Sequence, residues 1–273
     1  MQISKELTKK LYLLKTFLRD KKIIVAFSGG VDSSLLAYLS KKFADETLLI
    51  TEKSILYPDE EINEASNFAK EYKIPHMIIE RNPLQDIEFK KNPLNRCYIC
   101  KTGLYSDIIK IKNERNFDII LDGSNLDDLS DYRPGMQALK ELDISTPYID
   151  YKISKEEIRK ISDFYNLEVK SKPSMACFSS RIPYNQKIDE EKLEMIKQAE
   201  KFLKDNYKFT QVRVRYHDEK LARIELLPNE ILSILDSKNL KKIKDKFKDL
   251  GFCYVTIDLE GFRSGSMNEI LNL

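Results

Sequence analysis

Short apolar runs alternate with amphipathic segments along the first half of the chain. Strands are predicted where four or five apolar residues follow one another, because a strand buried on both faces of a parallel sheet has no polar side. Helices are predicted where apolar residues recur every three or four positions. The predicted strands are 23–27, 47–51, 75–79, 118–122 and 145–149, and the predicted helices are 32–43, 59–72, 100–112 and 154–165.

This alternation of strand and helix predicts an α/β fold with a doubly wound parallel sheet. Ligands of such sheets bind beyond the carboxyl ends of the strands. The helix at 154–165 opens with Ser154 and has Glu157 three residues later, which is the pattern of a capping box. A defined helix start is therefore expected there.

The pattern changes after residue 170. The segment 170–188 is irregular and contains two prolines, and the elements after it predict a small α+β domain: a helix at 190–204, strands at 210–216 and 221–227, a helix at 229–248 and a strand at 253–259. We therefore predict two domains. Residues 1–185 form a nucleotide-binding domain, and residues 186–273 form a C-terminal domain for substrate binding and oligomerisation.

Composition narrows the classes of partner. The 273 residues include 46 basic and 44 acidic side chains, a net charge of +2, so no global field attracts nucleic acid or an acidic membrane. No apolar run reaches the roughly 20 residues of a membrane span, and the N-terminal segment lacks the apolar core of a signal peptide. The expectation is a soluble cytoplasmic protein with no membrane or nucleic-acid partner.

A glycine-rich loop follows the first predicted strand and opens a helix. Gly29 and Gly30 allow the backbone to approach an anion, and free amides at the helix start favour negative charge. Asp32 could orient Mg²⁺. The loop lacks both the Gly-Lys-Ser/Thr ending of γ-phosphate-cleaving NTPases and the Gly-x-Gly-x-x-Gly of dinucleotide sites. It resembles the PP-loop of ATP pyrophosphatases, which cleave ATP between the α and β phosphates. The ATP-binding residues predicted here are Ala26, Ser28, Gly29, Gly30, Val31, Asp32 and Ser33.

A second polar motif follows the fourth predicted strand. It begins at Asp122 and runs through Gly123 and Ser124 to Asp127 and Asp128. Because the carboxyl ends of parallel strands meet at one edge of the sheet, this motif is expected beside the glycine-rich loop. Gly123 joins the predicted ATP site, and the carboxylates could hold Mg²⁺. A polar turn without a ligand remains the alternative.

Three cysteines stand in reactive surroundings. Cys97 and Cys100 lie at or near a helix start beside basic residues, which lowers thiol pKa, and Cys177 lies in a proline-containing loop. Three thiolates are one short of a closed zinc site. They suit a [4Fe–4S] cluster with one open iron. Zinc, or redox or sacrificial thiols without metal, are the alternatives. Together with Asp32, these three cysteines are the predicted catalytic residues.

Several segments in order resemble the LarE family of ATP-dependent sulfur transferases, which build the nickel-pincer nucleotide cofactor. The likeness covers nearly the whole chain. The matching segments are 26–34 (AFSGGVDSS), 92–101 (NPLNRCYICK), 131–135 (DYRPG), 176–184 (ACFSSRIPY), 213–215 (RVR), 222–225 (ARIE) and 258–269 (DLEGFRSGSMNE). Through the third of these segments, Arg133 joins the predicted ATP site.

The resemblance implies a substrate and a reaction. ATP adenylates a carboxylate of pyridinium-3,5-biscarboxylic acid mononucleotide, and sulfur displaces AMP to give a thiocarboxylate. In one family strategy the cysteine matching Cys177 gives up its own sulfur. In the other, three cysteines hold a [4Fe–4S] cluster that carries sulfide, and the presence of Cys97 and Cys100 favours this type. Sulfide or another sulfur donor is then a partner, and the resemblance also implies a homo-oligomer.

A cluster of arginines on the C-terminal strands is the predicted site for the substrate 5′-phosphate. Strand alternation places Arg213 and Arg215 on one face and Arg223 with Glu225 on a face of the next strand. Arg181 is a further candidate. Solvated charges on an exposed sheet are the alternative. Two rival functions stay open: a PP-loop tRNA thiolase, and a non-enzymatic nucleotide- or metal-binding protein.

Overall fold

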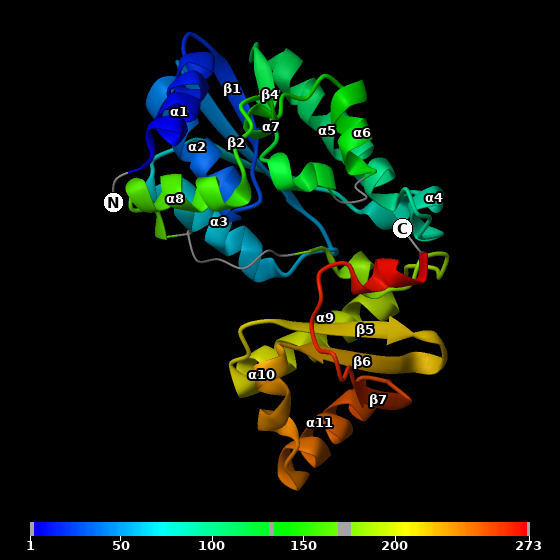
Figure 1. Cartoon of the computed structure of the whole chain (residues 1–273). Helices are drawn as coiled ribbons and strands as arrows, with labels where there is room; N and C mark the ends of the chain where they lie inside the picture. Colours follow the sequence, from blue (N-terminus) through cyan, green and yellow to red (C-terminus); the bar gives the residue numbers. More distant parts are fainter. Residues whose placement is uncertain (1–2, 131–133, 169–175, 272–273) are drawn as a thin grey trace. The chain divides into compact units, whose positions relative to one another are not determined.

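Two compact units make up the computed structural model, which describes residues 3–130, 134–168 and 176–271 (Figure 1). The first unit comprises residues 1–83 and 95–175, and the second comprises residues 84–94 and 176–273. The sequence prediction instead placed a single boundary at residue 185. Local patterning carries no sign that 84–94 belongs with the C-terminal part, because that association depends on hydrogen bonds between segments far apart in the sequence.

The first unit is built on a parallel four-stranded sheet with the order β3-β2-β1-β4. Its central strands β1 and β2 are buried over most of their length, as their continuous apolar runs predicted. The strands are β1 (Lys22–Ala26), β2 (Glu46–Lys53), β3 (His76–Glu80) and β4 (Ile119–Leu121).

Helices cover both faces of this sheet. Ile23 and Val25 of β1 pack with α1, α2, α3 and α8, whereas Ile24 packs with α5 and α6 on the other face. The predicted doubly wound arrangement is therefore confirmed (Figure 1). The helices of this unit are α1 (Lys5–Leu18), α2 (Val31–Phe43), α3 (Asp59–Glu71), α5 (Arg96–Glu114), α6 (Gly135–Glu141), α7 (Pro147–Asp150) and α8 (Lys155–Phe164), with the 3-10 helix η2 (Leu126–Ser130).

The predicted fifth strand at 145–149 is wrong beyond a single bridge. Ser145 pairs with Leu121 in parallel, but Pro147 then begins the short helix α7. A proline has no N–H for a strand ladder and suits the first position of a helix. The apolar run that suggested a strand is instead buried at Pro147 and Tyr148.

The second unit contains a three-stranded sheet with the order β5-β6-β7. The predicted helix at 229–248 is broken, because Asp236 caps a new helix by accepting hydrogen bonds from Lys238 N and Asn239 N. The elements are α4 (Ile87–Lys90), η4 (Phe178–Arg181), α9 (Glu190–Tyr207), β5 (Val212–His217), η5 (Asp218–Lys220), β6 (Leu221–Leu226), α10 (Pro228–Ile231), η6 (Leu232–Ile234), α11 (Ser237–Asp249), β7 (Tyr254–Ile257) and η7 (Ser266–Leu271), and η1 (Pro83–Gln85) spans a boundary between the units.

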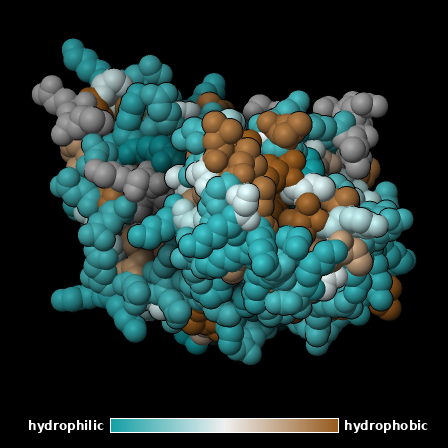
Figure 2. Space-filling view, turned by 90° about the horizontal axis from the view of Figure 1, so that it is seen from below, coloured by the Kyte–Doolittle hydropathy of each residue, from teal (hydrophilic) through white to brown (hydrophobic). Residues whose placement is uncertain are grey.

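The face drawn in Figure 2 is mainly hydrophilic, but apolar side chains gather in places on it. Figure 2 shows one face on which a group of hydrophobic residues stands among hydrophilic ones. In the second unit the most exposed large apolar side chains are Leu232 and Leu259, which are 80 % and 91 % exposed. Within the described ranges, no helix combines the length and apolar character that crossing a membrane requires.

Candidate functional site

The glycine-rich loop connects β1 to α2 and leaves the helix start open. Gly29 has a φ of +69°, a left-handed conformation that favours glycine. Gly30 is the N-cap of α2 and has no side chain to cap the first amides. The Ser33 hydroxyl donates to Gly30 O at 3.2 Å and accepts from Ser28 N at 3.3 Å. These two hydrogen bonds connect the loop to the first turn of α2. This geometry suits an anion at the helix N-terminus.

A chain of two hydrogen bonds anchors the start of this loop to the sheet. Thr51 Oγ1 donates to Phe27 O at 2.7 Å, and His76 Nε2 lies 2.8 Å from Thr51 Oγ1. The hydroxyl has one proton and gives it to the carbonyl, so His76 must be the donor, through Nε2–H. Burial lowers the pKa of His76.

A cavity of about 390 Å³ opens at the carboxyl ends of the strands, beside this loop. Gly123 follows β4 and lies so close to α2 that an added Cβ would be 3.1 Å from Ser33 N. The structure therefore brings the two sequence motifs together. The predicted ATP-binding residues that line the cavity are Ala26, Ser28, Gly30, Val31, Asp32, Ser33 and Gly123. Gly29 is part of the loop, and Arg133 lies outside the described residues.

Asp122 lines the cavity and is held there by four hydrogen bonds. Its Oδ2 accepts from Lys101 Nζ at 3.1 Å and from the Tyr105 hydroxyl, and its Oδ1 accepts from Ser124 N at 2.7 Å and from the Ser124 hydroxyl. Burial alone would raise the pKa of Asp122, but the Lys101 charge and these hydrogen bonds lower it to about 2. This carboxylate is therefore ionised, and each of its oxygens already accepts two hydrogen bonds from the protein.

Asp32 is the second residue of α2 and has one oxygen available. Lys155 Nζ, from the start of α8, donates to Asp32 Oδ2 at 2.5 Å. Asp32 Oδ1 is buried and makes no hydrogen bond within the part of the chain that the structure describes. Burial raises the pKa of Asp32, and Lys155 partly offsets this. An orphaned buried oxygen beside Asp128, which also lines the cavity, fits a Mg²⁺ ligand set.

The Cys-x-x-C pair lies at the start of α5. Cys100 lines the cavity, whereas Cys97 is exposed at the helix N-terminus. Cys177 belongs to the second unit, where it is the N-cap of η4. In residues 3–130, 134–168 and 176–271, no group of three His, Cys, Asp or Glu side chains is arranged to hold a metal ion. The iron–sulfur cluster stays a prediction.

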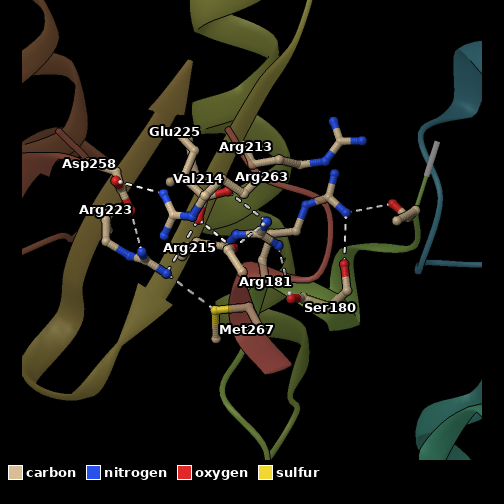
Figure 3. A network of polar contacts seen from close by, with 12 residues as sticks. Ser180, Arg181, Arg213, Val214, Arg215, Arg223, Glu225, Asp258, Arg263 and Met267 are labelled. Atoms are coloured by element: carbon tan, nitrogen blue, oxygen red, sulfur yellow. Dashed lines mark hydrogen bonds and ion pairs between the residues drawn. The ribbon is translucent and has the colours of Figure 1, made fainter. Parts of the chain in front are cut away.

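The predicted arginine face is present in the second unit. Arg213 lies opposite Glu225, and Arg215 lies opposite Arg223, so all four residues share one face of the β5–β6 pair, as strand alternation predicted. Arg215 donates to Glu225 Oε2 at 2.6 Å and to Ser180 O at 3.2 Å, while its buried Nε makes no hydrogen bond within the described residues (Figure 3). Burial lowers the pKa of Arg213 to about 10.

Arg181 is fully buried and organises the loop around Cys177. It forms two hydrogen bonds with Glu200, at 2.8 and 3.1 Å, and NH1 donates to the carbonyls of Ala176 and Cys177 at 2.6 and 3.0 Å. All three guanidinium nitrogens of Arg181 therefore donate hydrogen bonds to other parts of the protein. Arg223 is more exposed and contacts Asp258 and Met267 (Figure 3).

The chain is similar in sequence to several known proteins. The sequence model of the NAD synthase family matches residues 5–95, which include the glycine-rich loop. Two uncharacterized proteins are similar over 97 % of this chain: one from Synechocystis sp. at 38 % identity, covering 99 % of that protein, and one from Methanocaldococcus jannaschii at 36 %, covering 100 %. The pyridinium-3,5-bisthiocarboxylic acid mononucleotide synthase of Lactiplantibacillus plantarum is 32 % identical over 97 % of this chain and 95 % of that protein.

The chain belongs to the LarE family. The resemblance found in the sequence is thereby confirmed, and membership of LarE together with the NAD synthase match identifies an ATP-using PP-loop enzyme. ATP and Mg²⁺ are implied for LarE proteins as for other PP-loop enzymes.

Two basic residues of the LarE cavity escaped the sequence analysis. Lys155 lies within the capping-box motif that Ser154 and Glu157 define, and Lys101 is one of the basic residues beside the cysteines, but neither pattern predicts a place in the cavity. Both line the cavity and pair with Asp32 and Asp122. No sequence pattern links Lys155 to Asp32, because 123 residues separate them.

Proposed function

We propose that this protein uses ATP to convert carboxylates of pyridinium-3,5-biscarboxylic acid mononucleotide into thiocarboxylates. The observation that carries the proposal is that Cys100 lines the same cavity as the glycine-rich loop. A thiol at an ATP site favours sulfur, rather than nitrogen, as the acceptor of an activated acyl group. Kinship over nearly the full length with a synthase named for this bisthiocarboxylate product supports it.

ATP activates the carboxylate in this proposal. The loop residues Gly29 and Gly30 and the open start of α2 bind the phosphates, and Asp32 with Asp128 would hold Mg²⁺. The substrate carboxylate attacks the α-phosphorus, pyrophosphate leaves, and an acyl adenylate forms. Sulfide then attacks the acyl carbon, and AMP leaves. A carboxylate is a poor electrophile, and AMP is a good leaving group, so adenylation supplies the missing reactivity.

The three cysteines are proposed to hold a [4Fe–4S] cluster. Cys97 and Cys100 stand three residues apart on α5 and therefore share one helix face, and Cys177 stands in a partly buried loop whose carbonyl accepts a hydrogen bond from Arg181. When bound, such a cluster would offer an open iron for sulfide.

The second unit is proposed to bind the 5′-phosphate of the substrate. Arg213, Arg215 and Arg223 are the candidates, and the buried, unsatisfied Nε of Arg215 supports an anion there. In this proposal Arg181 does not bind the phosphate but holds the Cys177 loop in place through its hydrogen bonds to the carbonyls of Ala176 and Cys177. A homo-oligomer is proposed on the family resemblance alone.

The test is anaerobic turnover with the purified protein, the biscarboxylate mononucleotide, Mg²⁺–ATP and sulfide. We expect substrate-dependent release of AMP and pyrophosphate, and a mass change in the nucleotide for exchange of oxygen by sulfur. Iron and sulfide analysis of C97A, C100A and C177A variants tests the cluster separately. Formation of thiolated tRNA, with the mononucleotide left unchanged, would overturn the proposal.

A further inference from the structure

Arg81 connects the carboxyl edge of the parallel sheet to the helix that carries the cysteine pair. It directly follows β3, and its N–H donates to Lys53 O at the end of β2 at 3.0 Å. Its side chain is 18 % exposed and reaches α5, where Nε donates to Asp107 Oδ2 at 3.0 Å. No step of the proposed reaction uses this arginine.

The guanidinium of Arg81 joins two residues that line the cavity. Nη1 donates to Glu52 Oε1 at 3.1 Å and, in a longer contact, to Cys100 O at 3.5 Å. Glu52 and Cys100 both line the cavity beside the glycine-rich loop. Burial raises the pKa of Glu52, and the charge of Arg81 partly offsets this. A planar guanidinium with five donors can hold acceptors of a strand end and of a helix at the same time.

Gly103 makes room for this guanidinium. It lies inside α5, where glycine is about 1 kcal/mol less favourable than alanine. A Cβ at this position would be 2.2 Å from Arg81 Nη2 and 3.3 Å from Arg81 Cζ. The guanidinium therefore lies directly against the helix backbone, one turn after Cys100. The arginine occupies the space of the missing side chain, which explains a poor helix former in the middle of this helix.

We propose that Arg81 is a positioning residue for sulfur transfer, which fixes Cys100 at the ATP cavity by tying α5 to Glu52 near the end of β2. This inference deepens the proposed function and rests on it. Gly103 is required as well, because a larger side chain there pushes the guanidinium away from Glu52 and Cys100. Neither Arg81 nor Gly103 is among the described residues that line the cavity, so adenylation should depend little on them.

Anaerobic assays of the full-length protein separate the two half-reactions. Substrate-dependent exchange of pyrophosphate into ATP reports adenylation, and thiocarboxylate formation reports sulfur transfer. In G103A and R81Q we expect exchange within about threefold of wild type but thiocarboxylate formation roughly 10- to 100-fold lower, because a small misplacement of a reacting group is costly. The double variant should be no slower than either single variant, since both remove the same contact. K110Q, which removes only an exposed partner of Asp107 on the same helix, is the matched control and should keep both rates.

Cysteine alkylation of the full-length protein purified without iron gives a readout that needs no turnover. Mass spectrometry follows the alkylation rate of Cys100, with the exposed Cys97 as internal reference. ATP should slow alkylation of Cys100 in wild type, and this protection should be largely lost in G103A. Alanine favours the helix, so chemical denaturation should show G103A at least as stable as wild type, which separates positioning from folding.

Two results would overturn the inference. One is protection of Cys100 by ATP in G103A and R81Q as strong as in wild type. The other is a parallel fall of adenylation and sulfur transfer in both variants, which would make Arg81 a structural contact only. A wild type that forms no thiocarboxylate would instead count against the proposed function, while the alkylation result would still decide whether Arg81 positions Cys100.

Discussion

At the scale of single residues, the phosphate loop depends on side chains that do not belong to it. Phe27 O, at the start of the loop, is bound by Thr51 from β2, which in turn is bound by His76 from β3. Both strands lie on one side of β1 in the sheet. The position of the loop is therefore set by hydrogen bonds as well as by the turn chemistry of Gly29.

Replacing Thr51 by valine should loosen this anchor. The substitution keeps the shape but leaves Phe27 O and His76 Nε2 without their partner, which should cost about 1–3 kcal/mol of unfolding free energy. ATP affinity should fall as well, because the loop loses a fixed end. Chemical denaturation and nucleotide titration measure the two effects. H76Q, which retains Thr51, is the control, because its amide can replace the Nε2 donor, and both quantities should stay close to those of wild type.

His76 should also make stability depend on pH. Burial lowers its pKa in the folded protein, so below about pH 6.5 the unfolded chain takes up a proton that the folded chain still lacks. The unfolding free energy should therefore fall as the pH decreases from 7 to 5. Denaturation curves of wild type and H76Q at both pH values isolate this contribution. Because the pKa of His217 is lowered too, a residual slope is expected in H76Q. If the unfolding free energy of H76Q fell with decreasing pH as steeply as that of wild type, the prediction would be contradicted.

At the scale of elements, the first turn of α8 connects the phosphate cavity to α1. Its capping box was predicted from Ser154 and Glu157, and the structure confirms it. The same turn contributes Lys155 to the cavity and Glu157 to an ion pair with Lys10. The same helix start therefore contributes a residue to the cavity and an ion pair that stabilises the contact with α1.

Removing the cap should therefore be visible as a loss of stability. In S154A the Glu157 amide loses an acceptor at 3.3 Å, which should lower the unfolding free energy by about 1 kcal/mol. In S154D the aspartate provides an alternative cap, so this variant should keep most of the unfolding free energy of wild type. Thermal melting followed by circular dichroism measures the difference. An S154A protein as stable as wild type would mean that tertiary packing alone fixes this helix start.

Elements with a strong local signal could be predicted, and elements set by distant partners could not. The buried runs of β1 and β2 and the cap of α8 carry their own pattern. The break before α11 depends on Asp236 as a cap inside an amphipathic stretch, and the run at 145–149 looked like a strand although Pro147 starts a helix there. The motif residues of the cavity were recognisable, whereas Lys155 was not, because only the fold brings it to Asp32.

At the scale of the whole molecule, the second unit includes a segment taken from the middle of the first. Asn92 is fully buried, and its amide donates to Ile182 O at 3.2 Å and to Pro183 O at 2.7 Å. The neighbouring Lys90 O accepts from Ile188 N at 2.8 Å. The segment 84–94 is therefore part of the framework that supports the loop carrying Cys177.

A substitution in this segment should destabilise the second unit selectively. N92A removes both side-chain bonds and puts alanine at a φ of 55°, so a loss of about 3 kcal/mol is expected. N92G relieves the backbone strain alone and should recover part of the loss. Hydrogen exchange should show reduced protection in α9 and β5, with β1 and α2 unaffected. Uniform loss across both units would contradict this.

The interleaving of the two units has a consequence for synthesis on the ribosome. Asn92 is made 90 residues before Ile182, the acceptor of its first amide bond. At 5–20 residues per second this separation corresponds to roughly 5–20 s, during which the nascent segment has none of its final neighbours from the second unit. β4 follows this segment in the chain, so the four-stranded parallel sheet cannot be completed before the segment has been made. The second unit therefore cannot complete its fold until its C-terminal segment is made, whereas every residue of the first unit has been synthesised by residue 175.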